Sequence, residues 1–389
     1  MRTFLSPTQI WMFFWGLSLV SHGFISPTQA SPHRTSQQDF HSEEGCTSID
    51  LAQEVPELPM REARLQSSGW CVSFSVADLL SIKTGTQVSA TAVALAYYDH
   101  APVLGDGIIR TVRNYGHSWW THHSFKSTNK WGAFPERVLR TVIDDGFVCS
   151  EASVPSQYGD AGIASTEAYN KMLDHVENAH SEFGRMTQKQ ARTAAKPGAA
   201  DKNKKGECVS DETLQAAQIL FPKLDLEDFV KIAHRSEREN YLYKLSRWGC
   251  NAMGLPRGEN QFEVQQLSLG LSRSEGERGV RAIHEQLSLK NPVIISYTGE
   301  ALSDPQQAIR TSRRLKSVED THPNHASILI GRRWNPKARN GAGECQYQLK
   351  NTWGTSCSPY HFSLECEKGI VWVGSDLMSE MVSDVTWVK

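Results

Sequence analysis

The stretch "GWCVSFSVADLLSI" (residues 69–82) predicts a helix that carries a cysteine in its first turn. Apolar residues wrap around most of the predicted helical surface, so this helix is expected to be buried. Ser67 and Ser68 are candidate caps, and Gly69 permits a sharp turn directly before the helix. Cys71 would then lie at the positive end of the helix dipole, which stabilises a thiolate. The same position also suits a buried structural thiol or one half of a disulfide.

The beginning of the chain has the pattern of a secretory signal. Arg2 gives a positive start, and "IWMFFWGLSLV" (residues 10–20) is an apolar run too short to span a bilayer. The small residue Ala30 follows at a suitable cleavage point. We therefore expect residues 1–30 to be a signal peptide and the mature chain to be secreted or periplasmic, with no stable membrane span. An N-terminal membrane anchor is the alternative. Residues 31–60 form a polar N-terminal segment.

Composition and charge fit a globular protein without a general affinity for nucleic acid. The chain has 389 residues, of which 39% are hydrophobic, and a formal net charge of -2. This length allows roughly two or three domains. Because the net charge is close to zero, no overall field attracts nucleic acid or a membrane surface.

Eight cysteines are present, and in an oxidising compartment most of them should pair. If Cys71 is free, seven others remain, so one more must be unpaired. No C-x-x-C spacing occurs, which argues against a zinc site. Close spacing favours a bond between Cys357 and Cys366, and Cys208 is expected to pair with Cys250. One cysteine stays unpaired among the remaining three, which are Cys46, Cys149 and Cys345.

Residues 61–160 read as a helical region. Beyond the helix that begins at Cys71, "SATAVALAYYDH" (residues 89–100) and "FPERVLRTVIDDGFVCS" (residues 134–150) have helical patterns. Pro135 lies near the start of the latter and Gly146 at its end, which are the positions these residues favour.

The second half of the chain changes character twice. Residues 161–275 are rich in Lys, Glu, Gln, Asn and Ala, and predict a helical insertion that offers a surface for an inhibitor or partner protein. Residues 276–389 predict a β-rich region that opens with the helix "GVRAIHEQLSLK" (residues 279–290). Its predicted strands are "VIISY" (residues 293–297), "HASILIGRRW" (residues 325–334), "CQYQLKNTW" (residues 345–353) and "GIVWV" (residues 369–373).

Two polar residues lie at the ends of these strands. His325 begins one apolar strand, and Asn351 comes near the end of another. An asparagine amide can hold one imidazole nitrogen and so fix the tautomer and ring angle. Trp353 can shield that hydrogen bond from water, and Gly354 lets the backbone turn tightly. Taken singly, His325 also suits a packed core histidine and Asn351 a turn residue.

Other histidines are weaker candidates. His117, His122 and His123 cluster in "HSWWTHHSF", but no carboxylate or cysteine lies at ligand spacing, so a polar aromatic loop is the favoured interpretation. We expect neither a metal nor a cofactor. His322 is the nearest alternative base if His325 does not serve.

Three stretches resemble the papain-like cysteine peptidases, in the same order along the chain. They are "QSSGWCVSFS" (residues 66–75), "NHASILIGRRW" (residues 324–334) and "LKNTWGTSC" (residues 349–357). The resemblance implies an α+β, papain-like two-lobe fold, in which a helical lobe faces an antiparallel β-barrel-like lobe and carries a helical insertion.

The resemblance also implies a role for each matching residue. Cys71 is the nucleophile, and His325 is its base. Asn351 orients His325, and Trp353 covers that contact. Gln66 and the backbone N–H of Cys71 form the oxyanion hole. The remaining candidates are substrate contacts, namely Trp70, Gly132, Asn324 and Trp353.

The chain departs from the family pattern in three respects. Gln66 lies five residues before Cys71, one fewer than in the family, and Leu65 occupies the usual glutamine position. Thr352 replaces the usual serine. The interval between the cysteine and the histidine is long, and the insertion of residues 161–275 accounts for the excess.

We therefore expect an exported cysteine endopeptidase that hydrolyses protein or peptide substrates through an acyl-enzyme. An acyl transferase or amidase on the same scaffold is the first alternative, because the same thiol chemistry serves transfer to an amine. The second alternative is a catalytically inactive papain-like binding protein, which the shifted Gln66 favours.

Overall fold

The computed structural model describes residues 40–66, 70–100, 134–156, 166–194, 209–250, 253–255, 262–270, 272–307 and 325–389. In these ranges no helix is long and apolar enough to cross a membrane. Several predictions fall outside them. These concern the signal peptide of residues 1–30, the caps Ser67 and Ser68, the turn at Gly69, and the candidates His117, His122, His123, Gly132, Cys208, His322 and Asn324.

The strands form an antiparallel sheet in the order β4-β10-β5-β6-β7-β9-β8, and β1 pairs with β6. The long central strand β6 begins with eight buried residues, as its apolar sequence predicts. The bounds are β1 Ile49–Asp50, β4 Val264–Ser268, β5 Val293–Tyr297, β6 His325–Asn335, β7 Glu344–Lys350, β8 Glu365–Glu367, β9 Ile370–Gly374 and β10 Val382–Val388. A separate pair joins β2 Phe147–Val148 and β3 Met253–Gly254.

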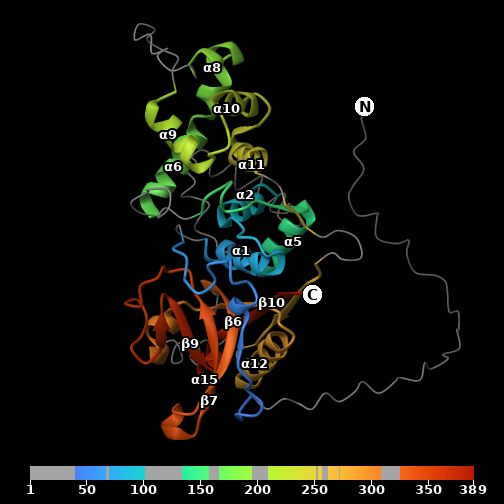
Figure 1. Cartoon of the computed structure of the whole chain (residues 1–389), viewed down its shortest axis with the longest axis vertical. Coiled ribbons are helices and arrows are strands. Elements are labelled where there is room, and N and C mark those ends of the chain that lie inside the picture. Colours follow the sequence, from blue (N-terminus) through green and yellow to red (C-terminus); the bar gives the residue numbers. More distant parts are fainter. Residues whose placement is uncertain are drawn as a thin grey trace, which may run out of the picture. The chain divides into compact units, whose positions relative to one another are not determined.

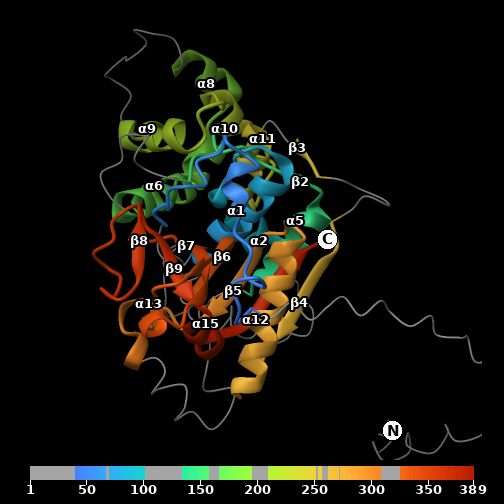
Figure 2. The same cartoon turned by 60° about the horizontal axis from the view of Figure 1, so that its bottom comes forward.

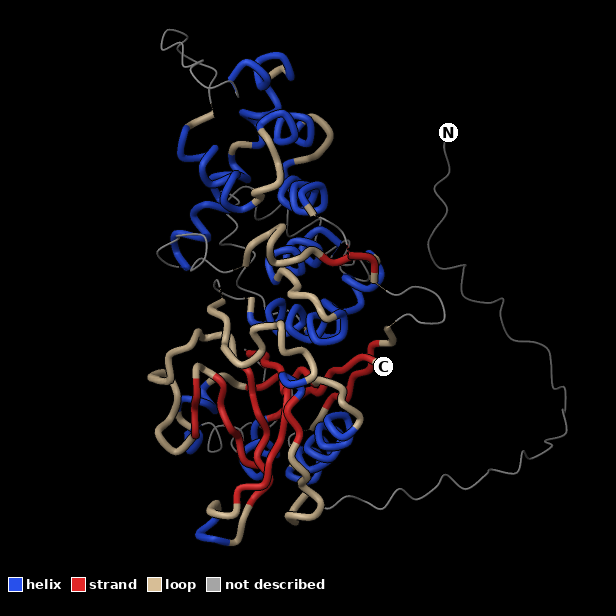
Figure 3. The backbone as a smooth tube through the Cα atoms, in the orientation of Figure 1, coloured by secondary structure: helices blue, strands red, loops and turns tan. Residues whose placement is uncertain are grey.

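Helices lie largely apart from this sheet, so the expected α+β class is confirmed (Figures 1 and 3). Helices α1, α2 and α5 pack together, and α1 also packs against β5 and β6. Their bounds are α1 Cys71–Thr84, α2 Ala90–His100 and α5 Pro135–Asp145. Helix α12 (Arg273–Ser288) packs along β5, β6 and β10 and contacts α15 (Ser375–Met381) (Figure 2).

Local sequence signals explain where these helices begin and end. Ser89 Oγ accepts a hydrogen bond from the Ala92 N–H at 3.0 Å and so caps α2. Pro135 opens α5, and Gly146 ends it with a left-handed φ of 74°, as predicted. Trp70 is the N-cap of α1 and supplies no side-chain hydrogen bond to it.

Most described residues of the predicted insertion are helical. Helices α6, α7, α9, α10 and α11 pack on one another, and α11 contacts α2 of the first helical region (Figure 1). The bounds are α6 Thr166–Asn178, α7 His180–Arg185, α8 Gln188–Ala194, α9 Asp211–Leu220, α10 Leu226–Ala233 and α11 Arg238–Gly249.

The helical prediction is wrong for Val264–Ser268, which form β4 and pair with β10. The physical reason is long-range pairing. The segment "VQQLS" has mixed polarity and takes its partner from Val382–Val388, more than a hundred residues away.

Two disulfides span 9 and 101 residues of the chain. The predicted bond between Cys357 and Cys366 is confirmed. The predicted partner of Cys250 is wrong, because Cys250 bonds to Cys149, with their Cα atoms 5.2 Å apart. The pairing of β2 with β3 brings these two cysteines together, which a reading of sequence spacing does not reveal.

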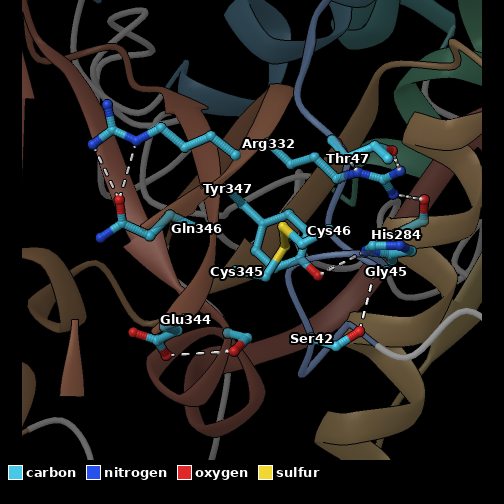
Figure 4. The surroundings of a disulfide bond; sticks show 12 residues. Ser42, Gly45, Cys46, Thr47, His284, Arg332, Glu344, Cys345, Gln346 and Tyr347 are labelled. Carbon is cyan, nitrogen blue, oxygen red and sulfur yellow. Dashed lines mark hydrogen bonds between the residues drawn. A yellow bond between two sulfur atoms is a disulfide. The ribbon is translucent and has the colours of Figure 1, made fainter. Parts of the chain in front are cut away.

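A third disulfide, Cys46–Cys345, fastens the N-terminal segment to the start of β7 (Figure 4). Beside it the buried Arg332 donates from Nε to the Thr47 carbonyl at 2.9 Å and from Nη1 to the His284 carbonyl at 2.7 Å. These contacts hold the segment of residues 40–66 to the sheet near its start, at Cys46 and Thr47.

Candidate active site

Cys71 is the first residue of α1 and is 6% exposed. Among the cysteines that the structure describes, it alone is free, because the other six form three disulfides. The sequence left open whether Cys71 is half of a disulfide, and the structure excludes that possibility for the described cysteines.

The thiol of Cys71 faces the beginning of β6. Burial raises the pKa of the Cys71 thiol, while backbone N–H groups of Ala326, Val72 and Cys71 itself act to lower it. Two of these donors belong to the N-terminus of α1, and the third belongs to the residue after His325. Helix α1 and strand β6 therefore meet at the thiol, and His325 is the first residue of that strand.

The imidazole of His325 is held by Asn351. Nε2 of His325 lies 2.6 Å from Oδ1 of Asn351. An amide oxygen only accepts, so Nε2 carries the proton and Nδ1 is the basic nitrogen. The same oxygen accepts from Ser327 Oγ at 3.0 Å and from the Thr352 N–H at 2.8 Å. These three donors fix which way the Asn351 amide points.

Aromatic rings enclose the imidazole. The Trp353 ring lies 5.1 Å from the His325 ring at 36°, and Tyr297 presents its edge at 5.3 Å and 87°. Tyr360 stacks on Trp353 at 5.5 Å. Burial lowers the pKa of His325 to about 4, although the bond to Asn351 acts to raise it. Burial thus favours the neutral forms of both the Cys71 thiol and the His325 imidazole.

Gln66 lies next to the segment that follows Asn351. The backbone N–H of Gln66 donates to the Thr352 carbonyl at 2.9 Å. The Thr352 hydroxyl in turn donates to the side-chain oxygen Oε1 of Gln66. Since the amide oxygen is turned toward Thr352, the amide nitrogen is directed away from it. Leu65 forms a β-bridge with Trp353. Its apolar side chain has no hydrogen-bond donor, so it cannot replace the amide of Gln66.

Two of the four predicted substrate contacts, Trp70 and Trp353, lie among the described residues. Trp70 is 1% exposed and packs edge-on against Tyr169 of α6 at 6.4 Å. A ring this deeply buried packs in the interior, so the prediction that Trp70 contacts substrate is wrong. Trp353 is half-buried between His325 and Tyr360. No group of three or more His, Cys, Asp or Glu side chains within the described ranges is arranged to hold a metal ion.

Sequence reasoning missed Ser327 and Tyr297. The Tyr297 hydroxyl lies 2.8 Å from Ser327 Oγ, and both side chains are buried. Because Ser327 donates to Asn351, Tyr297 is the donor to Ser327. One signal was available, since Ser327 lies two residues after His325 and strand residues two apart share a face.

Comparisons with known proteins found neither a matching family model nor a matching curated protein. Among solved structures, xylellain, a cysteine protease from Xylella fastidiosa, is 12% identical and aligns with a TM-score of 0.37 over 88% of this chain and 85% of its own. SERA5E from Plasmodium falciparum is 11% identical, with a TM-score of 0.41 over 88% of this chain and 95% of its own.

Proposed function

We propose that the protein is an exported papain-like cysteine endopeptidase. The observation that carries the proposal is the meeting of an unpaired cysteine at a buried helix N-terminus with the strand that begins at His325, whose Nε2 is bonded to Asn351. A structural thiol needs no imidazole oriented in this way, whereas a nucleophilic thiol does.

The reaction follows from the orientation of these groups. Nδ1 of His325 accepts the thiol proton, and Sγ of Cys71 attacks the peptide carbonyl carbon. The oxyanion is stabilised by the N–H of Cys71 and by the Gln66 amide nitrogen. The imidazolium then protonates the leaving amine as the C–N bond breaks, which leaves a thioester. Finally Nδ1 takes a proton from water, whose oxygen attacks the thioester carbonyl. The C–S bond breaks, the carboxylic acid is released, and the imidazolium returns its proton to Sγ of Cys71.

Export is supported by the disulfides. Three bonds join Cys46 with Cys345, Cys149 with Cys250, and Cys357 with Cys366. Such bonds persist in oxidising compartments and are rare in the cytosol.

Covalent labelling tests the proposal. The native protein is treated with limiting iodoacetamide at pH 6 to 7, and the alkylated peptides are mapped by mass spectrometry. We expect Cys71 to be labelled first, and the label to abolish cleavage of a peptide library. If Cys71 is labelled first but the unlabelled protein cleaves no peptide of the library, the binding protein is favoured. Products joined to added amines would favour an acyl transferase. Cys71 found in a disulfide would exclude the endopeptidase and the acyl transferase, because both need a free thiol.

A further inference from the structure

Four charged side chains that the reaction does not use lie together beside the candidate site, three of them buried and the fourth part-buried. Arg64, Asp78 and Lys350 have side chains that are 2%, 2% and 0% exposed, and Glu151 is 16% exposed. We call these four residues the charge cluster. Two positive and two negative charges balance within it. Burying ions is costly, and a well-packed apolar group often stabilises a fold at least as well. Ion pairs differ from apolar contacts in having a fixed direction, so such a cluster constrains geometry.

Asp78 is the centre of the charge cluster. Oδ1 of Asp78 lies 2.5 Å from Nη2 of Arg64, and Oδ2 lies 3.1 Å from Nζ of Lys350. Each carboxylate oxygen therefore holds a different cation. Asp78 also lies seven residues after Cys71 in α1, about two helical turns, so both residues lie on the same side of the helix.

Lys350 ties this helix to the strand that presents Asn351. It is the last residue of β7, and Asn351 follows it directly. Its ammonium is fully enclosed, with Asp78 as its anionic partner at 3.1 Å and the Pro59 carbonyl at 3.5 Å. A sliding of α1 along the sheet would break the ion pair, and the two buried charges would lose each other.

Arg64 ties the same helix to the segment that carries Gln66. Its guanidinium reaches Asp78 and, through Nη1, Glu151 at 3.4 Å. Its own carbonyl accepts from the Gly354 N–H at 3.0 Å, two residues from Thr352, which engages Gln66. The stretches 64–66 and 352–354 thus form a short antiparallel pair, and Arg64 fastens this pair to α1.

We propose that Asp78 is a positioning residue, one carboxylate that sets the Cys71 thiol in register with His325 and the oxyanion donors. It does so by clamping α1 to Lys350 and Arg64, the anchors of the Asn351 and Gln66 segments. The inference rests on the cysteine-hydrolase function proposed above. An apolar contact would hold these segments together as well, but without a preferred register, whereas two directed ion pairs to one carboxylate define a single alignment.

The test separates alignment from stability by restoring charge balance. Asp78→Asn alone leaves an excess buried positive charge, so it lowers both the thermal midpoint and turnover. The double variant Asp78→Asn/Lys350→Met removes one charge of each sign and leaves Arg64 with Glu151. We expect its thermal midpoint to return toward that of the native protein. We expect kcat and the alkylation rate of Cys71 to remain roughly 10-fold to 10²-fold low, with KM changed far less.

Asp145→Asn is the matched control. Asp145 is a buried carboxylate at the end of α5, 7% exposed, that accepts from Tyr243 at 2.8 Å and Arg247 at 2.9 Å. Its loss should lower the thermal midpoint while leaving Cys71 alkylation at the native rate. A double variant that regains both stability and native alkylation would overturn the positioning role.

Alkylation needs no substrate, so it also separates this inference from the proposed function. Slower alkylation in His325→Ala than in the native protein shows that the thiol and imidazole cooperate. If Cys71 in the double variant Asp78→Asn/Lys350→Met is then alkylated about as slowly as in His325→Ala, the positioning role is supported. If His325→Ala is alkylated at the native rate, the thiol and imidazole do not cooperate, and both the function and the positioning role fail.

Discussion

Nε2 of His325 donates a hydrogen bond to Oδ1 of Asn351 over 2.6 Å, and this contact leaves Nδ1 as the basic nitrogen of the imidazole. Both residues are buried, and each sits at the end of a strand of the central sheet: His325 opens β6 and Asn351 follows β7 directly. The two strands are neighbours in an antiparallel ladder, so the rigid sheet sets the distance between base and orienting amide.

Loss of the base should be more damaging than loss of the amide that orients it. His325→Ala should remove nearly all turnover, because no group then accepts the thiol proton. Asn351→Ala should retain a measurable part of the activity, since the imidazole is still present but can rotate or change tautomer. The measurement is kcat/KM on a cleaved peptide, with circular dichroism as the check on folding. Near-native turnover in His325→Ala would require another base, and His322 is the nearest candidate in sequence.

Ser327→Ala should lower turnover without affecting substrate binding. Ser327 Oγ donates to Asn351 Oδ1 at 3.0 Å and receives a bond from Tyr297. Removing one hydrogen bond of this kind costs about 1 kcal/mol, which corresponds to roughly fivefold in rate if it acts on the base orientation. Ser246→Ala, another buried serine but on α11, is the control. Equal effects of the two substitutions on kcat would contradict a role for Ser327 at the site.

Gln66→Ala should lower kcat by about 10²-fold, the scale expected for the loss of one oxyanion donor. KM should change far less, because the donor acts mainly on charge that develops in the transition state. Thr352→Val should give part of this effect, since the Thr352 hydroxyl bonds the amide oxygen of Gln66. Thr352→Ser keeps the hydroxyl and should behave as the native enzyme. A Gln66→Ala protein with native kcat would mean that the shortened spacing has removed this side chain from the reaction.

The positions of Cys71, His325 and Asn351 within their elements could be predicted because local signals mark them. A glycine precedes the buried helix, an apolar strand starts at His325, and a glycine follows Asn351 closely. Asp78 also left a signal, since a lone carboxylate inside an apolar helix requires a partner. Its partners Arg64 and Lys350 depend on the tertiary fold, so sequence spacing did not identify them.

Non-local pairing accounts for the features that sequence reasoning missed. Strand β4 has mixed polarity and is defined by its partner β10, at the other end of the β-rich part of the chain. The bond of Cys250 with Cys149 likewise depends on the pairing of β2 with β3. Neither contact has a periodic pattern within its own segment, so only the folded arrangement identifies it.

Removing the Cys46–Cys345 bond should destabilise the protein more than removing Cys357–Cys366. The first closes a separation of 299 residues and the second a separation of 9, and the loss of unfolded-state entropy grows with loop length. We expect the paired serine variant at Cys46 and Cys345 to lose about 2–4 kcal/mol of unfolding free energy. Urea titration of both paired variants measures the difference. A larger loss at the short loop would show that native-state contacts outweigh chain entropy in this protein.

Glu177→Gln should stabilise the protein at neutral pH and have little effect in acid. Burial, together with Asp174 and Glu239, raises the pKa of Glu177 to about 7, while Arg238 acts to lower it, and its Oε2 has no hydrogen-bond partner among the described residues.

The sign follows from proton binding. Between pH 4.5 and about 7 the folded carboxyl keeps a proton that the unfolded chain has released, so the contribution of Glu177 to stability falls as the pH rises. Glutamine mimics the protonated carboxyl and should not show this fall. Burial lowers the pKa values of His284 and His325 to about 4, so these two residues make stability rise with pH. The native protein and the Glu177→Gln variant share this contribution, and it cancels in their difference. The difference in unfolding free energy between variant and native protein should therefore be small at pH 4.5 and grow in favour of the variant up to pH 8. A difference that is constant over this range would mean that Glu177 titrates alike in the folded and unfolded chain.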